Sequence, residues 1–202
     1  MFGLGGLCDL CGASARGLCS RCREDLPAPP AIDLWPDLDA VHAVIAYEGR
    51  GSALLRGAKF SNRRSSLDVL ADSAVPFLGH AIGTVVPVPA DATRRRRRGY
   101  DLPELLADIV GKRLGVASTR ALGRTGHETQ QGLPRRDRLH RGGFRATRSV
   151  AGTVLLVDDV VTTGATARAC AALLRAGGAD AVDLFVIAAT PPPKSDSQGP
   201  VD

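Results

Sequence analysis

The sequence is poor in aromatic residues and in lysine. Phe, Trp and Tyr together make up 4% of its 202 residues, and Trp35 is the only tryptophan. Only three of the 26 basic residues are lysines, so guanidinium groups carry nearly all of the positive charge. Because single-stranded nucleic acids are commonly held by bases stacked on aromatic rings, this composition argues against an extended stacking surface.

Long apolar segments are also absent. No run approaches the ~20 apolar residues that a membrane-spanning helix needs. Residues 1–10 lack the basic start and the apolar run of a secretory signal. We therefore expect a cytoplasmic protein without membrane insertion, whose length suits one α/β domain with a small appendage.

The positive charge is unevenly distributed. The net charge is +5, yet residues 94–148 hold 14 Arg and one Lys against five acidic residues, which leaves the rest of the chain mildly acidic. A basic stretch on one face of a protein attracts phosphate or nucleic acid. A solvated surface of an arginine-rich protein is an equally good explanation of the composition alone.

Beyond residue 40, segments typical of strands alternate with segments typical of helices. Several of the strand segments are apolar throughout, as strands covered on both faces are. This pattern predicts an α/β fold with a mostly parallel twisted sheet flanked by helices. The expected strands are residues 41–47, 84–88, 154–157 and 182–189, and the expected helices are residues 51–60, 67–80, 102–114 and 165–176.

The remaining segments indicate the domain organisation. Residues 1–26 are rich in Gly and Cys, and residues 27–40 form a Pro-rich linker before the main domain at 41–190. Within that domain, residues 123–148 are polar and weakly periodic, which predicts a functional loop or disorder. Residues 191–202 have the composition of a disordered tail.

The N-terminal segment contains two CxxC pairs with seven residues between them. The two pairs supply four thiolates, the number that a tetrahedral Zn²⁺ ion accepts. Two disulfides are the alternative, which the absence of a secretion signal disfavours. Because cysteine fills all four positions, the zinc would be structural rather than catalytic. The predicted ligands are Cys8, Cys11, Cys19 and Cys22.

The most informative motif, VLLVDDVVTTGAT, begins at Val154. Its apolar strand delivers two carboxylates to the edge of the sheet where ligands bind in open α/β folds. A short Thr-Thr-Gly loop then opens a helix, whose unpaired N–H groups and dipole favour a phosphate. The predicted site residues are Asp158, Asp159, Thr162, Thr163, Gly164, Ala165 and Thr166.

The two carboxylates suit the neighbouring part of a phosphorylated ligand. Asp158 and Asp159 can accept hydrogen bonds from the 2′ and 3′ hydroxyls of a ribose, or can bind a Mg²⁺ ion beside them. The sequence has no GxxxxGK[ST] loop, so it is not a Walker-type nucleotide site. The alternative is an ordinary Asp-Asp turn followed by a helix cap, but a cap needs only one of these residues.

Five consecutive arginines, residues 94–98, follow the strand predicted at 84–88. In a parallel sheet they would lie at the same edge as the Thr-Thr-Gly loop and could pair bidentately with pyrophosphate oxygens. Arg98, next to the following helix, is the best candidate for a functional arginine, and Arg97 is a weaker one. A solvated charge run is the alternative.

These motifs resemble a known family. Residues 154–166 are similar to the phosphoribosyl pyrophosphate (PRPP) signature of type I phosphoribosyltransferases. The four cysteines, Pro-Val-Pro at 87–89, Arg-Gly-Tyr at 98–100, Gln-Gly-Leu at 131–133 and Gly-Phe at 143–144 resemble the ComF family of competence proteins. One departure is visible: where that family usually has Arg-Gly-Phe-Asn-Gln, this chain has Asp101 in place of the Asn and Leu102 in place of the Gln.

The resemblance implies a role for each part. Asp158 and Asp159 would contact the ribose hydroxyls, and residues 162–166 would surround the 5′-phosphate. The loop after residues 84–88 would bind pyrophosphate. Residues 127–138 would form a mobile hood that excludes water, in which Gln131 can hydrogen-bond a base or sugar and Arg138 can close on pyrophosphate.

Two kinds of function fit these expectations. In the first, PRPP and Mg²⁺ bind, a nitrogen nucleophile attacks the anomeric carbon, and pyrophosphate leaves. In the second, a non-catalytic nucleotide-binding module holds single-stranded DNA and a helicase partner during DNA uptake, as the resemblance to competence proteins implies. A sensor of PRPP or a nucleotide is a third possibility.

Overall fold

A four-stranded parallel sheet, β1-β7-β6-β2, forms the centre of the computed structural model, which describes residues 6–32, 34–72, 81–90, 99–125, 140–141 and 143–191. At its β2 edge, residues 117–119 add a short parallel stretch, because the Val85 amide donates to the Ala117 carbonyl and the Thr119 amide donates to the Val85 carbonyl. The strands are β1 (Ala40–Ala46), β2 (Ile82–Pro87), β6 (Gly152–Val161) and β7 (Ala179–Ala189).

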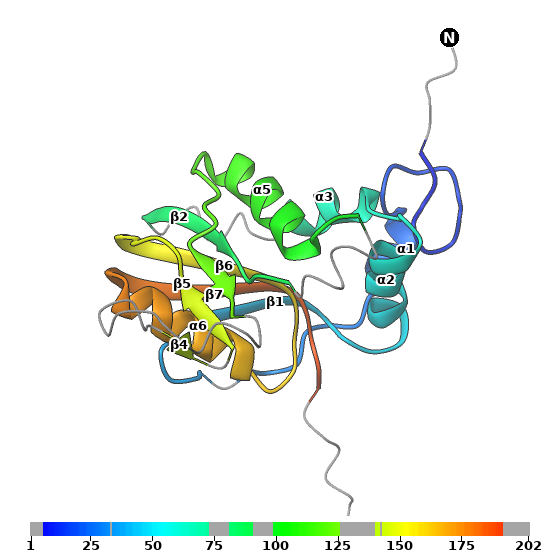
Figure 1. Cartoon of the computed structure of the whole chain (residues 1–202). Coiled ribbons are helices and arrows are strands. Elements are labelled where there is room, and N and C mark those ends of the chain that lie inside the picture. The colour runs from blue at the N-terminus through cyan, green and yellow to red at the C-terminus, as the bar shows by residue number, and fades with distance from the viewer. Residues whose placement is uncertain are drawn as a thin grey trace, which may run out of the picture.

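Helices cover both faces of this sheet, as Figure 1 shows. Helix α5 (Leu102–Leu114) and the short α3 (Ser65–Ala71) lie over one face, with α2 (Gly49–Phe60) beside them, and α6 (Ala165–Ala176) lies on the other. The strict alternation of side chains along a strand explains the arrangement: Leu155 faces the cluster of α2, α3 and α5, while Leu156 faces that of α6. The predicted α/β fold with a parallel sheet is confirmed.

Strand β6 is longer than the sequence predicts. The pattern indicates residues 154–157, but pairing with β7 continues through Asp158, opposite Val186, to Val161, opposite Ala189. The two carboxylates therefore belong to the strand itself and do not follow it. Both lie at the end of the strand, where neither residue is completely buried.

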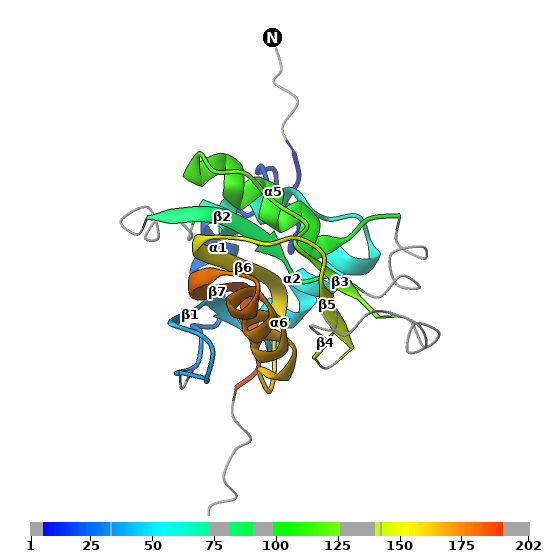
Figure 2. The same ribbon diagram turned by 60° about the vertical axis from the view of Figure 1, so that its left-hand side comes forward.

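The segment expected to be a loop or disordered begins and ends in a small antiparallel sheet. Its order is β3-β5-β4, with β3 at Leu122–Arg124, β4 at His140–Arg141 and β5 at Phe144–Ala146. Phe144 is buried in the core beside α6, and the Arg124 guanidinium lies over its ring, 4.7 Å from the centroid. Figure 2 shows this sheet next to α6. Strands of two or three residues are too short for their periodicity to be read from the sequence.

The N-terminal module packs directly on the helices of the main domain, at the end of the molecule where α1 (Ser20–Glu24) meets α2 in Figure 1. Cys8, Leu18 and Cys22 are buried in the same apolar cluster as α2, α3 and α5. The Ser66 amide, at the start of α3, donates to the Asp9 carboxylate over 2.7 Å. The module thus shares one apolar core with α2, α3 and α5.

The segment between the module and β1 is anchored rather than free. The Ala46 amide of β1 donates to the Pro27 carbonyl, and the Asp39 amide donates to the Val182 carbonyl of β7. Leu38 is buried in the cluster on the α6 face. Within the residues that the structure describes, no helix has the length and apolar character needed to cross a membrane.

Candidate functional site

The end of β6 and the start of α6 form a loop suited to an anion. Gly164 precedes the helix in the left-handed conformation, with φ 72°, and its carbonyl accepts from the Arg168 amide over 2.9 Å. Thr162, Thr163, Ala165 and Thr166 are exposed, and the Ala165 amide donates to the Thr163 hydroxyl over 3.4 Å. A small cavity of about 60 Å³ is lined by Asp158 and by these loop residues. The loop can therefore offer several donors to one phosphate-sized group.

The two carboxylates next to this loop have different partners. The Asp159 amide donates to an Asp158 carboxylate oxygen over 2.7 Å. Burial, followed by repulsion from the Asp159 charge, raises the pKa of Asp158 to about 8. The negative charge of Asp101 also raises this pKa, whereas the Asp159 amide and the Lys59 cation lower it.

Lys59 is the counter-ion that the sequence reasoning missed. Its Nζ lies 2.9 Å from an Asp159 carboxylate oxygen, and the two side chains are only 15% and 13% exposed. Lys59 lies in the last turn of α2, whose Leu55 and Ala58 are buried in the core. The available signal was weak: Lys59 is one of three lysines in a chain that otherwise uses arginine. Nothing local in the sequence pairs it with a residue one hundred positions away.

The departure at Asp101 has a structural role. Asp101 precedes α5 and is buried, and its carboxylate accepts from the Ala90 amide over 3.2 Å, in the segment that follows β2. The neighbouring Tyr100 hydroxyl donates to the Ala58 carbonyl in α2, and the Arg64 guanidinium lies 4.4 Å from the Tyr100 ring centroid. The acid thus anchors the loop after β2, while Tyr100 holds the start of α5 against the helix that carries Lys59.

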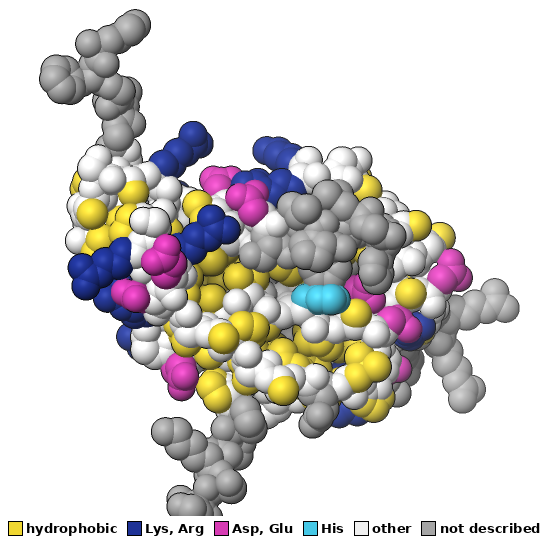
Figure 3. Space-filling view, turned by 180° about the vertical axis from the view of Figure 1, so that it is seen from behind, with side chains coloured by type: hydrophobic (Ala, Val, Ile, Leu, Met, Phe, Trp, Pro, Cys, Tyr) yellow, Lys and Arg dark blue, Asp and Glu magenta, His cyan; other side chains and the backbone are white. Residues whose placement is uncertain are grey.

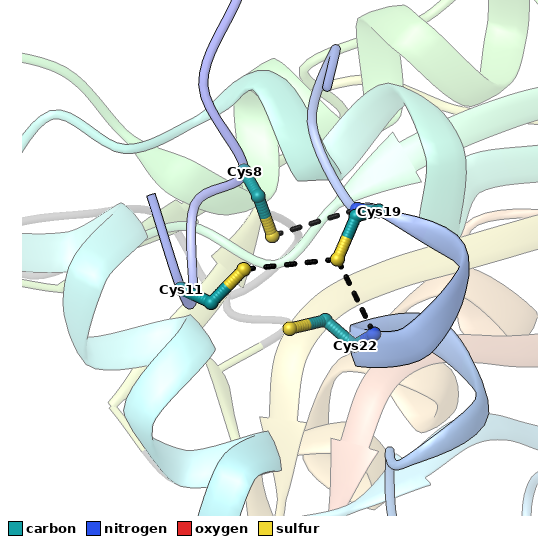
Figure 4. Close-up of side chains that lie close together, drawn as sticks. All are labelled: Cys8, Cys11, Cys19 and Cys22. Atoms are coloured by element: carbon teal, nitrogen blue, oxygen red, sulfur yellow. Dashed lines mark hydrogen bonds between the residues drawn. The ribbon is translucent and has the colours of Figure 1, made fainter. Parts of the chain in front are cut away.

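The four N-terminal cysteines converge on one point, as Figure 4 shows. Their sulfur atoms all lie within 4.8 Å of one another, and the Cys11 and Cys19 sulfurs are 3.7 Å apart. A tetrahedral zinc ion with Zn–S bonds of about 2.3 Å needs sulfurs about 3.8 Å apart, so the donor set fits a metal. The described cysteines are all free thiols in this arrangement, which leaves the two-disulfide alternative without support.

Donors around the cluster stabilise negative charge on sulfur. The Cys19 amide donates to the Cys8 sulfur, and an Arg50 guanidinium nitrogen donates to the Cys22 sulfur over 3.3 Å. Although burial alone would raise it, backbone N–H groups lower the pKa of the Cys8 thiol to about 6. Burial and the three neighbouring cysteines raise the pKa of Cys22 to about 12. A bound divalent cation would offset the repulsion between the four thiolates, as four-cysteine sites require.

Comparisons with known proteins identify the family. No family model matches the chain. DNA utilization protein YhgH of Escherichia coli (strain K12) is 30% identical over an alignment of 209 positions, which covers 92% of this chain and 91% of that protein. Competence protein F of Haemophilus influenzae is 32% identical over 114 residues, 52% of this chain and 49% of that protein. The chain belongs to the ComF family.

The solved APRTase from Giardia lamblia complexed with 9-deazaadenine aligns with a TM-score of 0.42 and 19% identity, over 66% of this chain and 70% of that chain.

The structure of this ComF protein brings together one part of the predicted site. Asp158, Asp159, Thr162, Thr163, Gly164, Ala165 and Thr166 lie around one cavity or next to it. The five arginines ending at Arg98, together with the hood residues Gln131 and Arg138, lie outside the described residues. The segment after β2 does reach the site's vicinity, because Asp101 both holds Ala90 and acts electrostatically on Asp158.

The raised pKa of Asp158 predicts how stability depends on pH. An acid with a raised pKa binds its proton more tightly in the folded state, so its contribution to stability is full below the unfolded value of 3.8 and is lost as pH rises to about 8. We therefore expect Asp158→Asn to melt about 5 °C above the wild type at pH 8 and to approach it near pH 4. Thermal unfolding monitored by circular dichroism measures this. Asp108→Asn, at an exposed acid of α5, serves as the control. An equal difference in melting temperature between Asp158→Asn and the wild type at both pH values would contradict the raised pKa of Asp158.

The Lys59–Asp159 pair predicts an energetic coupling. Lys59→Met keeps the aliphatic stem but leaves the Asp159 charge without its partner, so we expect a loss of about 1–3 kcal/mol in the free energy of unfolding. In an Asp159→Asn background the same substitution should cost much less, because no charge is stranded. Urea unfolding of the four proteins gives the coupling energy. Lys112→Met, at an exposed lysine of α5, should be neutral; strictly additive effects of Lys59 and Asp159 would rule the coupling out.

Proposed function

We propose that this ComF protein binds PRPP or a phosphoribosyl nucleotide with Mg²⁺ and transfers the phosphoribosyl group to a nitrogen acceptor. The observation that carries the proposal is the junction of β6 and α6, where the Asp158 carboxylate and a loop of exposed residues line one small cavity, and Asp159 comes next in the strand. In this arrangement the loop would bind the 5′-phosphate and the acids would contact the ribose hydroxyls. The type I phosphoribosyltransferase signature in the sequence supports the same assignment.

In this proposal, each part of the chain has a distinct task. Residues 162–166 bind the 5′-phosphate through backbone N–H groups and threonine hydroxyls. Asp158 and Asp159 accept from the ribose hydroxyls, and Lys59 holds Asp159 in place while offsetting its charge. The oxygen-rich donor set of Asp158, Asp159 and the ligand's own oxygens fits Mg²⁺.

The reaction would form one bond and break one. The acceptor nitrogen attacks the anomeric carbon of the ribose as the bond from that carbon to pyrophosphate breaks, and the nitrogen proton leaves to solvent. Mg²⁺, when bound, would supply charge neutralisation for the departing pyrophosphate. Arg98 would pair with the same oxygens, and Gln131 and Arg138 would close over the site and exclude water.

The cysteine module would hold a structural zinc ion. With Cys8, Cys11, Cys19 and Cys22 as its four ligands, no position stays open for substrate or water. The role of the metal would be to keep the module docked on α2 and α3. Because α2 carries Lys59, the zinc site would support the acid pair from a distance.

Calorimetric titration with PRPP and Mg²⁺ tests the proposal. We expect saturable binding by the zinc-loaded wild type and at least a 30-fold weaker affinity for Asp158→Asn/Asp159→Asn, because both positions lose the carboxylate that would contact the ribose hydroxyls and Mg²⁺. Asp108→Asn should bind as the wild type does. Release of pyrophosphate, assayed with a panel of nitrogen acceptors, then tests turnover. A wild type that shows no binding would refute the proposed function.

A second candidate function, binding of single-stranded DNA together with a helicase partner in DNA uptake, is favoured by a basic surface and by the names of the two relatives. Figure 3 shows Lys and Arg side chains, with acidic side chains among them, at the end of the molecule that carries the cysteine module. Phe60, at the end of α2, is 69% exposed there and could stack on a base. The exposed arginines of the module and α2 are Arg16, Arg21, Arg23, Arg50 and Arg56, and Arg63 follows them.

The salt dependence of DNA affinity tests this candidate. We expect the triple variant Arg16→Ala/Arg21→Ala/Arg23→Ala to weaken binding of an oligothymidylate. The slope of log K against log salt should fall by about 0.7 for each phosphate that the variant no longer neutralises. A triple variant of equal charge, Lys112→Ala/Arg145→Ala/Arg168→Ala, removes exposed charge elsewhere. Fluorescence anisotropy at several salt concentrations measures both. Equal losses of affinity in the two variants would assign the effect to net charge alone, and the surface would have no special role.

A further inference from the structure

Trp35, the only tryptophan, lies against the phosphate loop although it precedes β1 in the chain. A Cβ atom placed on Gly164 would lie 2.6 Å, 2.7 Å and 2.8 Å from three fused-ring atoms of the Trp35 indole. The ring therefore lies directly over the Gly164 backbone. Gly164 is buried, whereas its neighbours Thr163 and Ala165 are exposed, so only this point of the loop is covered.

We propose that Trp35 is a positioning residue that holds the phosphate loop in its binding conformation, an inference that rests on the proposed binding of a 5′-phosphate there. Gly164 has φ 72°, a conformation that glycine adopts easily but also leaves easily. The indole removes the space into which the loop backbone could relax. The N–H groups of the first turn of α6 are then fixed before the ligand arrives, which lowers the entropic cost of binding.

The ring is itself held by a rigid support. The Trp35 carbonyl accepts from the Leu38 amide over 3.2 Å, and Leu38 is buried against the α6 face of the sheet. Arg175, at the far end of α6, donates to the Asp37 carbonyl over 3.1 Å and pairs with the Asp39 carboxylate, which also accepts from the Val182 amide of β7. Figure 1 shows this segment passing close to α6 before β1 begins. Both ends of α6 are thereby tied to the same short stretch of chain.

The ring supports the loop from outside the cavity. Among the described residues, those that line the cavity come from β6, the loop, α6 and β7, and Trp35 is not one of them. The indole therefore does not compete with a phosphate for space. Glycine at position 164 is required on two counts: the positive φ disfavours a side chain, and the indole fills the position that a Cβ would take.

The first test compares ligand affinity in variants of Trp35. Titration calorimetry with ribose 5-phosphate, and with PRPP plus Mg²⁺, should give a dissociation constant about 10-fold higher for Trp35→Ala than for the wild type. Trp35→Phe keeps an aromatic cover and should stay within about 3-fold of the wild type. Unchanged affinity in Trp35→Ala would overturn the proposal, provided that the wild type binds.

A second test needs no ligand and so separates this inference from the proposed function. In the ligand-free protein, hydrogen exchange at the Arg168 amide, which donates to the Gly164 carbonyl, should be at least 10-fold faster in Trp35→Ala, with little change at Leu173 and Leu174 in the same helix. Acceleration spread evenly along α6 would show a merely structural role and overturn the proposal. If the wild type binds neither ligand while the local acceleration is observed, the proposed function fails and the positioning contact stands.

A third comparison tests the contact if Trp35→Ala folds poorly. Gly164→Ala should lower the melting temperature sharply in the wild type, because the new Cβ meets the indole. In the Trp35→Ala background the same change should cost less than half as many degrees, since only the backbone strain remains. Equal losses in both backgrounds would show that the ring does not pack on Gly164.

Discussion

The burial of β6 between β2 and β7 is the constraint on which the rest of this structure depends. Its residues Val154–Val157 are fully covered on both faces, so the helices on both sides of the sheet pack against this strand or its neighbours. The strand cannot shift along β7 without moving a whole row of apolar side chains to the wrong face. Its last residues, including Asp158 and Asp159, are therefore delivered to one end of the sheet with little freedom.

Around that fixed strand end, the site is assembled from four parts of the chain. The loop and α6 follow directly from β6, and they provide the donors. Helix α2 arrives from the opposite face with Lys59, and Asp101 fixes the segment that follows β2. The segment before β1 supplies Trp35, which covers Gly164. Repulsion between the two acids is reduced because Lys59 pairs with Asp159, and because the raised pKa keeps Asp158 protonated over a wider pH range.

The cysteine module belongs to this assembly and is more than an attachment. Its buried Cys8, Leu18 and Cys22 complete the apolar cluster under α2 and α3, and Arg50 of α2 reaches back to the Cys22 sulfur. The cysteine cluster therefore packs directly against the helix that carries Lys59. Helix α2 thus contacts both the cysteine cluster and the acid pair at the end of β6, which lie far apart in the sequence.

Local signals in the sequence were sufficient for much of the fold. Apolar runs identified the parallel strands, and the periodicity of residues 102–114 matched α5 residue for residue. The loop of Thr162, Thr163 and Gly164 was readable because its residues are consecutive in the sequence. The small sheet of β3, β4 and β5 was missed, since strands of two or three residues leave no detectable period. The end of β6 was also missed, because hydrogen bonding to β7 outweighed the polarity of two acids.

By itself, the sequence determined the elements whose causes are local: the order of strands and helices, the four thiols at metal-binding spacing, and the run of donors that opens α6. Only the tertiary structure decided which distant residues complete the site. It placed Lys59 against Asp159, gave Asp101 an anchoring role and laid Trp35 over Gly164. The physical reason is that side-chain spacing within one element follows from backbone geometry, whereas contacts between elements depend on how the whole core packs.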